Sequence, residues 1–140
     1  WKDRGYEKGE THVFWLSFLR DVMNVSEPEK IIQFEVPVKL KHKSFIDGFL
    51  IDTKVIIEQK SIKENLNLEK SQSDGTVLTP FEQAQRYSTA LPYSKRPRWI
   101  IVSNFKEFLI YDLETMSDPE KILLEELPEK YHEENRTGQL

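Results

Sequence analysis

The chain has 140 residues, 38% of them hydrophobic, and this predicts one compact domain with a full core. It has no cysteine, which excludes disulfides and thiolate zinc sites, and no apolar run reaches the ~20 residues that cross a bilayer. The net charge of −4 argues against nucleic-acid binding by bulk charge, although local basic clusters could still provide it.

These features favour a cytoplasmic domain without a membrane partner. Because the chain starts with Trp1 and ends in a polar stretch, we expect a piece of a longer protein. The folded domain is expected over residues 1–130, with a polar tail or linker over 131–140.

The first half of the chain predicts one helix and one strand. Helical spacing indicates an amphipathic helix over residues 10–23, which should lie against a sheet. Its expected buried stripe is Val13, Leu16, Leu19 and Met23, widened by Phe14, Trp15, Phe18 and Val22. Alternation predicts a strand over residues 31–40, with Ile32, Phe34, Val36 and Val38 on one face.

The second half begins with a long polar segment, residues 61–78, which we expect to be a mobile or functional loop. Thr79, Pro80 and Glu82 form a capping box that starts a helix ending near residue 90. Buried strands follow over residues 98–103 and 108–112. Residues 121–124 fit either an edge strand or a short helical turn.

The stretch from Phe45 to Lys60 reads as two strands joined by a tight turn. Alternation places Glu58 and Lys60 on one face of the second strand. If Asp52 and Thr53 form a two-residue turn, Asp47 lies directly opposite Glu58. A slip of one residue at the turn would set Asp47 against Ile57 or Gln59 instead.

Two opposed carboxylates are destabilising unless a cation lies between them, and Mg²⁺ prefers such oxygen ligands. Lys60 would then lie beside a metal-bound water, an arrangement that suits metal-assisted hydrolysis. Alternatively, the stretch is a solvated hairpin with ordinary surface charges. Both acids interrupt apolar runs, however, and buried carboxylates need a partner.

Other polar residues have two readings each. Glu10 either favours the positive end of the helix dipole or reaches the metal site as a third acid. Gln83 and Tyr87 are four residues apart and share a helix face. Basic residues gather before the hairpin (Lys39, Lys41, His42, Lys43) and before a later strand (Lys95, Arg96, Arg98), as solubilising strand ends or as phosphate contacts.

Asp47 followed by Glu58, Gln59 and Lys60, within this element order, resembles the PD-(D/E)xK nuclease superfamily, with Ile46 in place of the usual Pro. Residues 83–87 resemble the QxxxY motif of its RecB-like branches. The resemblance implies an α/β (α+β) fold with a restriction-endonuclease-like αβββαβ core, in which helices flank a mixed central sheet.

A closer resemblance, to the N-terminal domain of MmeI-like restriction and modification enzymes, covers nearly the whole chain. It is carried by Gly5–Glu10, Phe14–Leu16, Phe34–Val38, Ile57–Ser61, Gln72–Gly75, Leu78–Ala84 and Pro97–Trp99. In these enzymes a PD-(D/E)xK module precedes an adenine-N6 DNA methyltransferase and a target-recognition domain. No methyltransferase motif is found here, so S-adenosylmethionine belongs to that other part.

The resemblance implies roles residue by residue. Asp47, Glu58 and the Gln59 backbone carbonyl would hold Mg²⁺ or Mn²⁺, Lys60 would be the catalytic lysine, and Gln83, Tyr87 and Glu10 would support them. Lys41, Lys43, Lys63, Arg96 and Arg98 are the expected contacts to double-stranded DNA. The implied function is a DNA endonuclease domain; the alternatives are a non-cleaving DNA-positioning module of a methyltransferase and a stand-alone RecB-like exonuclease.

Overall fold

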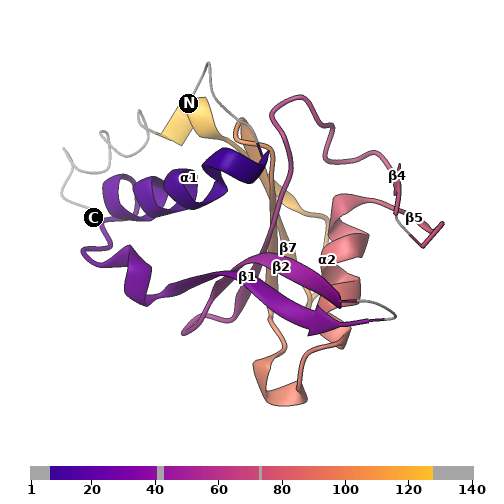
Figure 1. Ribbon diagram of the computed structural model, residues 1–140. Helices are drawn as coiled ribbons and strands as arrows, with labels where there is room; N and C mark the ends of the chain where they lie inside the picture. Colours follow the sequence, from indigo (N-terminus) through magenta and orange to yellow (C-terminus); the bar gives the residue numbers. More distant parts are fainter. Residues whose placement is uncertain (1–6, 41–42, 73, 128–140) are drawn as a thin grey trace.

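The computed structural model describes residues 7–40, 43–72 and 74–127, and side chains from Gly9 onward (Figure 1). The helices are α1 (Glu7–Asp21), α2 (Pro80–Thr89) and the 3-10 turns η1 (Pro28–Lys30), η2 (Tyr93–Lys95) and η3 (Leu124–Glu126). The strands are β1 (Ile32–Lys39), β2 (Lys43–Leu50), β3 (Val55–Gln59), β4 (Lys70–Ser71), β5 (Val77–Leu78), β6 (Trp99–Ser103), β7 (Glu107–Asp112) and β8 (Glu120–Leu123).

Six strands form one mixed sheet in the order β1-β2-β3-β6-β7-β8. Strands β3 and β6 are parallel, and every other neighbouring pair is antiparallel. The parallel pair needs a crossover, which α2 supplies. This arrangement confirms the predicted α/β class and the expected restriction-endonuclease-like core. The predicted domain boundary near residue 130 lies outside the described residues.

The two helices cover opposite faces of the sheet (Figure 1). One core cluster contains Ile56, Ile100, Val102 and Ala84 of α2, and the other contains Ile57 with Phe14 and Trp15 of α1. Neighbouring residues of β3 therefore supply different clusters, as alternation along a strand requires. Within the described residues, no helix combines the length and apolar character that a membrane span needs.

Helix α2 follows the sequence prediction closely. Thr79 is the N-cap, its hydroxyl accepts from the Glu82 amide, and Glu82 accepts from the Thr79 amide. Pro80 opens the helix and Ala90 caps its end. The capping box fixes where the helix starts, so it also fixes which side chains its first turn presents to β3.

Helix α1 starts earlier than predicted, and its buried stripe is rotated. Phe14, Trp15 and Leu19 are buried, whereas Val13 and Met23 are exposed. The error arises because nearly every position from 13 to 19 is apolar, so periodicity alone does not fix the stripe. Aromatic contacts decide it: Trp15 stacks on Phe108 of β7, with ring centroids 5.3 Å apart.

The sequence analysis expected the apolar residues of β1 to lie on one face of the sheet. The structure places them on both faces. Ile32 and Phe34 pack on the α1 side, but Val36 and Val38 pack on the α2 side. The change occurs at Glu35, whose φ of 52° is in the left-handed region and interrupts the alternation. Pairing with β2 continues on both sides of this residue.

The polar segment 61–78 has more structure than predicted. Strands β4 and β5 form a small antiparallel hairpin, and Leu66 is buried in the α2-side core. Arg86 of α2 holds the hairpin through an ion pair with Asp74 at 2.6 Å. The sequence did not decide between a strand and a helical turn for residues 121–124. They belong to the edge strand β8 and to the start of η3.

Gly48 of β2 provides a test of this packing. A Cβ at Gly48 would lie 3.3 Å from Ile57 Cβ and 3.3 Å from Ile57 Cδ1, both on the neighbouring strand. We expect Gly48→Ala to lower the free energy of unfolding by about 1–3 kcal/mol, as overpacked cores do. Urea denaturation measures the change.

Gly9→Ala is the matched control, because a Cβ there meets nothing within 4 Å and Gly9 lies inside α1. Helix propensity predicts that Gly9→Ala stabilises the protein by up to about 1 kcal/mol. Equal effects of the two substitutions would contradict the close β2–β3 packing.

Candidate metal and catalytic centre

The site is built on the β2–β3 hairpin. The register of this hairpin determines how its two acids, Asp47 and Glu58, lie relative to each other. Gly48 pairs with Ile57 and Phe49 with Ile56, so the neighbouring positions Asp47 and Glu58 lie opposite each other, as predicted. The turn is longer than the two residues expected, since the ladder ends at the Leu50–Val55 pair. A loop of four residues keeps the register, and Lys54 closes it with a positive φ of 54°.

Asp47 is held by a backbone hydrogen bond. The Gln59 amide donates to Asp47 Oδ2 at 2.8 Å, and the Asp47 and Glu58 carboxyl groups lie opposite each other on β2 and β3. Burial raises the pKa of Asp47, while the Gln59 amide and the Lys60 charge oppose the rise. The carboxylate therefore has a fixed direction before any ligand arrives.

Glu58 is almost fully buried. Burial raises its pKa well above the ordinary value, and the negative charge of Asp47 raises it further. Two carboxyl groups in contact, inside a protein, retain a proton unless a cation replaces it. The pair has the oxygen donors and the unbalanced charge that suit a hard divalent ion.

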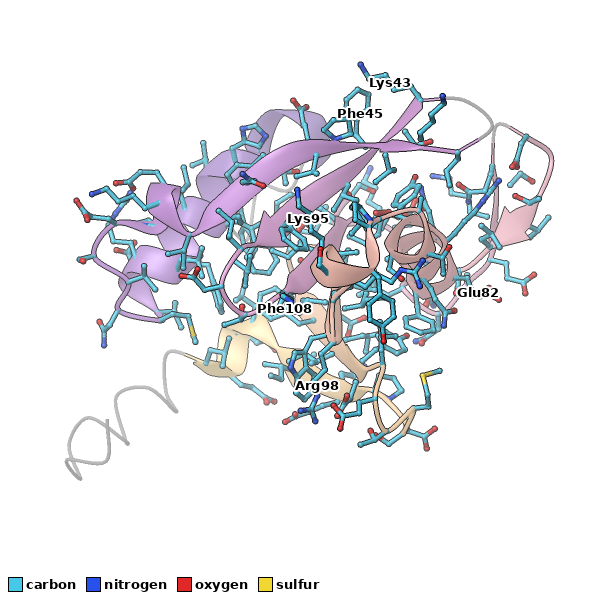
Figure 2. All side chains as sticks on the ribbon, turned by 90° about the horizontal axis from the view of Figure 1, so that it is seen from below. Lys43, Phe45, Glu82, Lys95, Arg98 and Phe108 are labelled. Carbon is cyan, nitrogen blue, oxygen red and sulfur yellow. The ribbon has the colours of Figure 1, made fainter. Side chains whose placement is uncertain are left out.

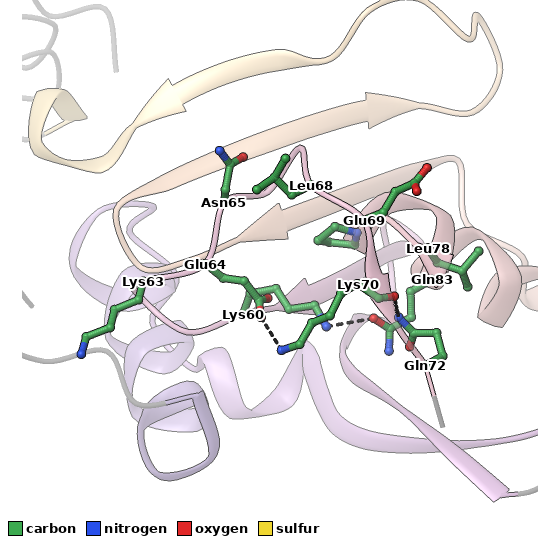
Figure 3. Close-up of a pocket in the computed structure, with 11 residues that line it drawn as sticks. Lys60, Lys63, Glu64, Asn65, Leu68, Glu69, Lys70, Gln72, Leu78 and Gln83 are labelled. Atoms are coloured by element: carbon green, nitrogen blue, oxygen red, sulfur yellow. Dashed lines mark hydrogen bonds and ion pairs between the residues drawn. The ribbon is translucent and has the colours of Figure 1, made fainter. Parts of the chain in front are cut away.

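Lys60 brings a cation to the same face. Its ammonium lies 3.4 Å from Glu58 Oε2. It also donates to Gln83 Oε1 at 2.8 Å (Figure 3). Gln83 in turn donates through Nε2 to the Tyr87 hydroxyl at 2.8 Å. The predicted neighbours Gln83 and Tyr87 thus lie together and fix the lysine, and burial raises the pKa of Tyr87.

Glu10 lies in α1 and is half-buried. Among the described residues there is no group of three or more His, Cys, Asp or Glu side chains that could hold a metal ion. A role for Glu10 as a third acid therefore stays a prediction. With Asp47 and Glu58 as the acidic donors, further ligands would be the Gln59 carbonyl and water, which Mg²⁺ commonly retains.

The predicted basic contacts lie at two ends of the sheet. Lys43 opens β2, with its ammonium 5.5 Å from the Phe45 ring centroid, and Lys63 follows Lys60 by three residues. Figure 2 shows Lys43 and Arg98 on opposite sides of the molecule. Lys41 lies outside the described residues.

Arg96 and Arg98 lie near the start of β6, whereas the acids lie near the end of β3, which runs parallel to it. Arg98 forms ion pairs with Asp112 at 3.1 Å and with Glu114 at 3.4 Å. Arg96 donates to the carbonyls of Thr89 and Leu91, which end α2. Both arginines have structural partners, and neither is near the two acids.

A cavity of about 320 Å³ adjoins Lys60 (Figure 3). Lys60 and Gln83 form one wall, and the segment 63–72 with Leu78 and Pro80 forms the others. Glu64 and Lys70 form an ion pair across it at 2.7 Å. Sequence reasoning named Lys60, Lys63 and Gln83 but missed the other lining residues of segment 61–78, because that segment has no periodic signal.

The Asp47–Glu58 pair predicts how stability depends on pH without metal. The ordinary values are 3.8 for Asp and 4.5 for Glu, and both pKa values are raised on folding. The folded state therefore binds more protons than the unfolded state above about pH 4.5, so this pair lowers stability as the pH rises toward neutrality.

We expect Glu58→Gln to remove most of this loss. In EDTA at neutral pH the variant should have a higher free energy of unfolding than the original protein, and the difference should shrink toward pH 4.5. Urea denaturation across this pH range measures it. A Glu58→Gln protein that is less stable at neutral pH would show that the carboxylate is well compensated without metal.

Comparisons with known proteins were made for the whole chain. No curated protein and no solved structure matches it. One family model, described as the N-terminal domain of MmeI, matches residues 1–139. The match spans the complete sheet, both helices and all residues of the Asp47–Tyr87 site. The chain therefore belongs to the MmeI N-terminal domain family.

Proposed function

We propose that this chain is the Mg²⁺-dependent DNA endonuclease domain of a restriction–modification enzyme and hydrolyses phosphodiester bonds. The observation that carries the proposal is the ion pair between the buried Glu58, which lies opposite the half-buried Asp47, and a lysine that a Gln–Tyr pair orients. Membership of the MmeI N-terminal domain family supports the restriction–modification context.

The donor set fits a divalent ion. Asp47 is half-buried, Glu58 is buried, and the negative charge of each disfavours ionisation of the pair, so a cation between them would relieve their repulsion. When bound there, Mg²⁺ or Mn²⁺ supplies Lewis-acid stabilisation of the phosphate and a more acidic water. We assign Asp47, Glu58 and the Gln59 carbonyl to its binding.

Lys60 would orient the attacking water and stabilise the negative charge that develops on the phosphate. Two contacts limit its side chain to one position, the carboxylate of Glu58 and the amide oxygen of Gln83. The hydroxyl of Tyr87 fixes the Gln83 amide by accepting from its NH₂ group. Because Tyr87 holds Gln83 and Gln83 holds Lys60, we propose that Gln83 and Tyr87 support the lysine.

DNA would approach from the end of the sheet that carries Lys43 and Lys63. Both side chains are exposed, and they lie at the end where β3 finishes. Two exposed lysines in a chain with a net charge of −4 provide little nonspecific affinity. We therefore assign most of the DNA affinity and all of the sequence specificity to a linked target-recognition domain. We assign the binding of S-adenosylmethionine to a linked methyltransferase.

The central test is Lys60→Ala in the full-length protein. We expect DNA cleavage to fall by at least about a hundredfold, because the ammonium acts mainly on the transition state. DNA affinity, metal affinity and any methylation should stay nearly unchanged. Cleavage is measured by gel assay, and metal binding by calorimetry.

Two variants accompany this test. Lys121→Ala is the matched control, since Lys121 lies on the edge strand β8 and pairs with Glu107 at 3.2 Å. It should cut normally. Asp47→Asn should lose metal binding together with cleavage. Normal cutting by Lys60→Ala would end the catalytic assignment, and unfolding of that variant would make Lys60 a structural partner of Glu58.

The DNA path has its own test. We expect Lys63→Ala to weaken DNA binding at low salt and to reduce the slope of log affinity against log salt concentration by about one. Lys95→Ala, at the other end of the sheet, should leave both quantities unchanged. Fluorescence anisotropy in a series of salt concentrations measures them, and equal losses would place DNA elsewhere.

A further inference from the structure

Helix α1 is linked to the catalytic strand by one buried polar contact. The Trp15 indole N–H donates to Gln59 Oε1 at 2.7 Å. Both side chains are buried, with 2% and 0% of their surface exposed. Trp15 lies on the face of the sheet opposite to Glu58 and Lys60, since Gln59 and Glu58 alternate along β3.

Gln59 carries this contact to the backbone of Lys60 and to the side chain of Asp47. Its side-chain Nε2 donates to the Lys60 carbonyl at 3.1 Å, and its amide donates to Asp47 Oδ2 at 2.8 Å. The Lys60 amide donates to the Ser103 carbonyl at 2.7 Å. Residues 59 and 60 are therefore held from both faces of the sheet and from β6.

A role in packing alone does not require a hydrogen bond between Trp15 and Gln59. A buried tryptophan N–H needs an acceptor, but an apolar neighbour and a phenylalanine would avoid the need altogether. A glutamine amide buried in the run Val55–Gln59 is costly unless every group is paired. Here the Gln59 amide holds the Asp47 carboxylate, and the Gln59 side chain holds the backbone of Lys60, the residue whose ammonium the proposed site uses.

We propose that Trp15 and Gln59 are positioning residues, which hold the backbone of residues 59 and 60, and with it the Gln59 carbonyl between them, the Asp47 carboxylate and the base of the Lys60 side chain. This inference rests on the proposed function. It follows from the shortage of acidic donors, because the described residues contain no cluster of three metal-binding side chains. A site with two carboxylates depends strongly on the direction of its backbone ligand.

The experiment measures metal affinity in the full-length protein without DNA, so that cleavage plays no part. Trp15→Phe removes the N–H donor and keeps an aromatic ring, and Gln59→Met removes the amide at similar length. Each variant should bind Mn²⁺ about 10- to 100-fold more weakly by calorimetry. The double variant should lose no more than Gln59→Met alone, because Trp15 acts only through Gln59.

Phe18→Leu is the matched control for helix packing. Phe18 contacts the Trp15 and Phe108 rings, at centroid distances of 5.7 and 5.1 Å, but does not take part in the hydrogen bond. It should lower the melting temperature and leave metal affinity unchanged. Additive losses in the double variant, or a loss of affinity in Phe18→Leu, would overturn the inference and leave a packing role.

A spectroscopic signal gives an independent readout. The Trp15 indole N–H resonance should shift when Mg²⁺ is added, while that of Trp99, at the start of β6, should not. In Gln59→Met the Trp15 shift should disappear. A protein that binds metal normally but shows no Trp15 shift would overturn this inference alone, whereas a protein that binds no metal would overturn the proposed function as well.

Discussion

The opposition of the Asp47 and Glu58 carboxyl groups on neighbouring strands is the constraint on which the rest of the site depends. Like charges on neighbouring strands are tolerated only when other groups compensate them. The Gln59 amide and the Lys60 ammonium compensate part of the charge, but the pKa of both acids stays raised. The fold thus keeps a pair that disfavours its own ionised state, which is why the proposed metal is assigned to it.

The hairpin and α2 were predictable because their signals are local. Strand alternation has a period of two, so the face of Glu58 and Lys60 follows once the strand is recognised. The Thr79–Glu82 capping box fixes the start of α2 within one residue, and helical spacing then pairs Gln83 with Tyr87. The turn length was predicted wrongly, but the register was not affected, because a four-residue loop also places Asp47 opposite Glu58.

Features that depend on tertiary contacts were not predictable in this way. The stripe of α1 is selected by aromatic packing on Phe108, and the face change in β1 by one left-handed residue, Glu35. Neither leaves a pattern in the sequence. The Trp15–Gln59 hydrogen bond did leave one: a buried glutamine within an apolar strand needs a partner, and a helix on that face with an indole N–H can supply it.

The two helices make polar contacts with two neighbouring residues, Gln59 at the end of β3 and Lys60 directly after it, from opposite faces of the sheet. Gln83 of α2 holds the Lys60 side chain, and Trp15 of α1 holds the Gln59 side chain. The pairing of β3 with β6 fixes the backbone between them through the Ser103 carbonyl. Because α1, α2 and β6 all hold residues 59 and 60, a small displacement of either helix would move the Lys60 side chain or the Gln59 carbonyl relative to the two acids. The geometry therefore makes the proposed chemistry sensitive to whatever contacts the outer surfaces of α1 and α2.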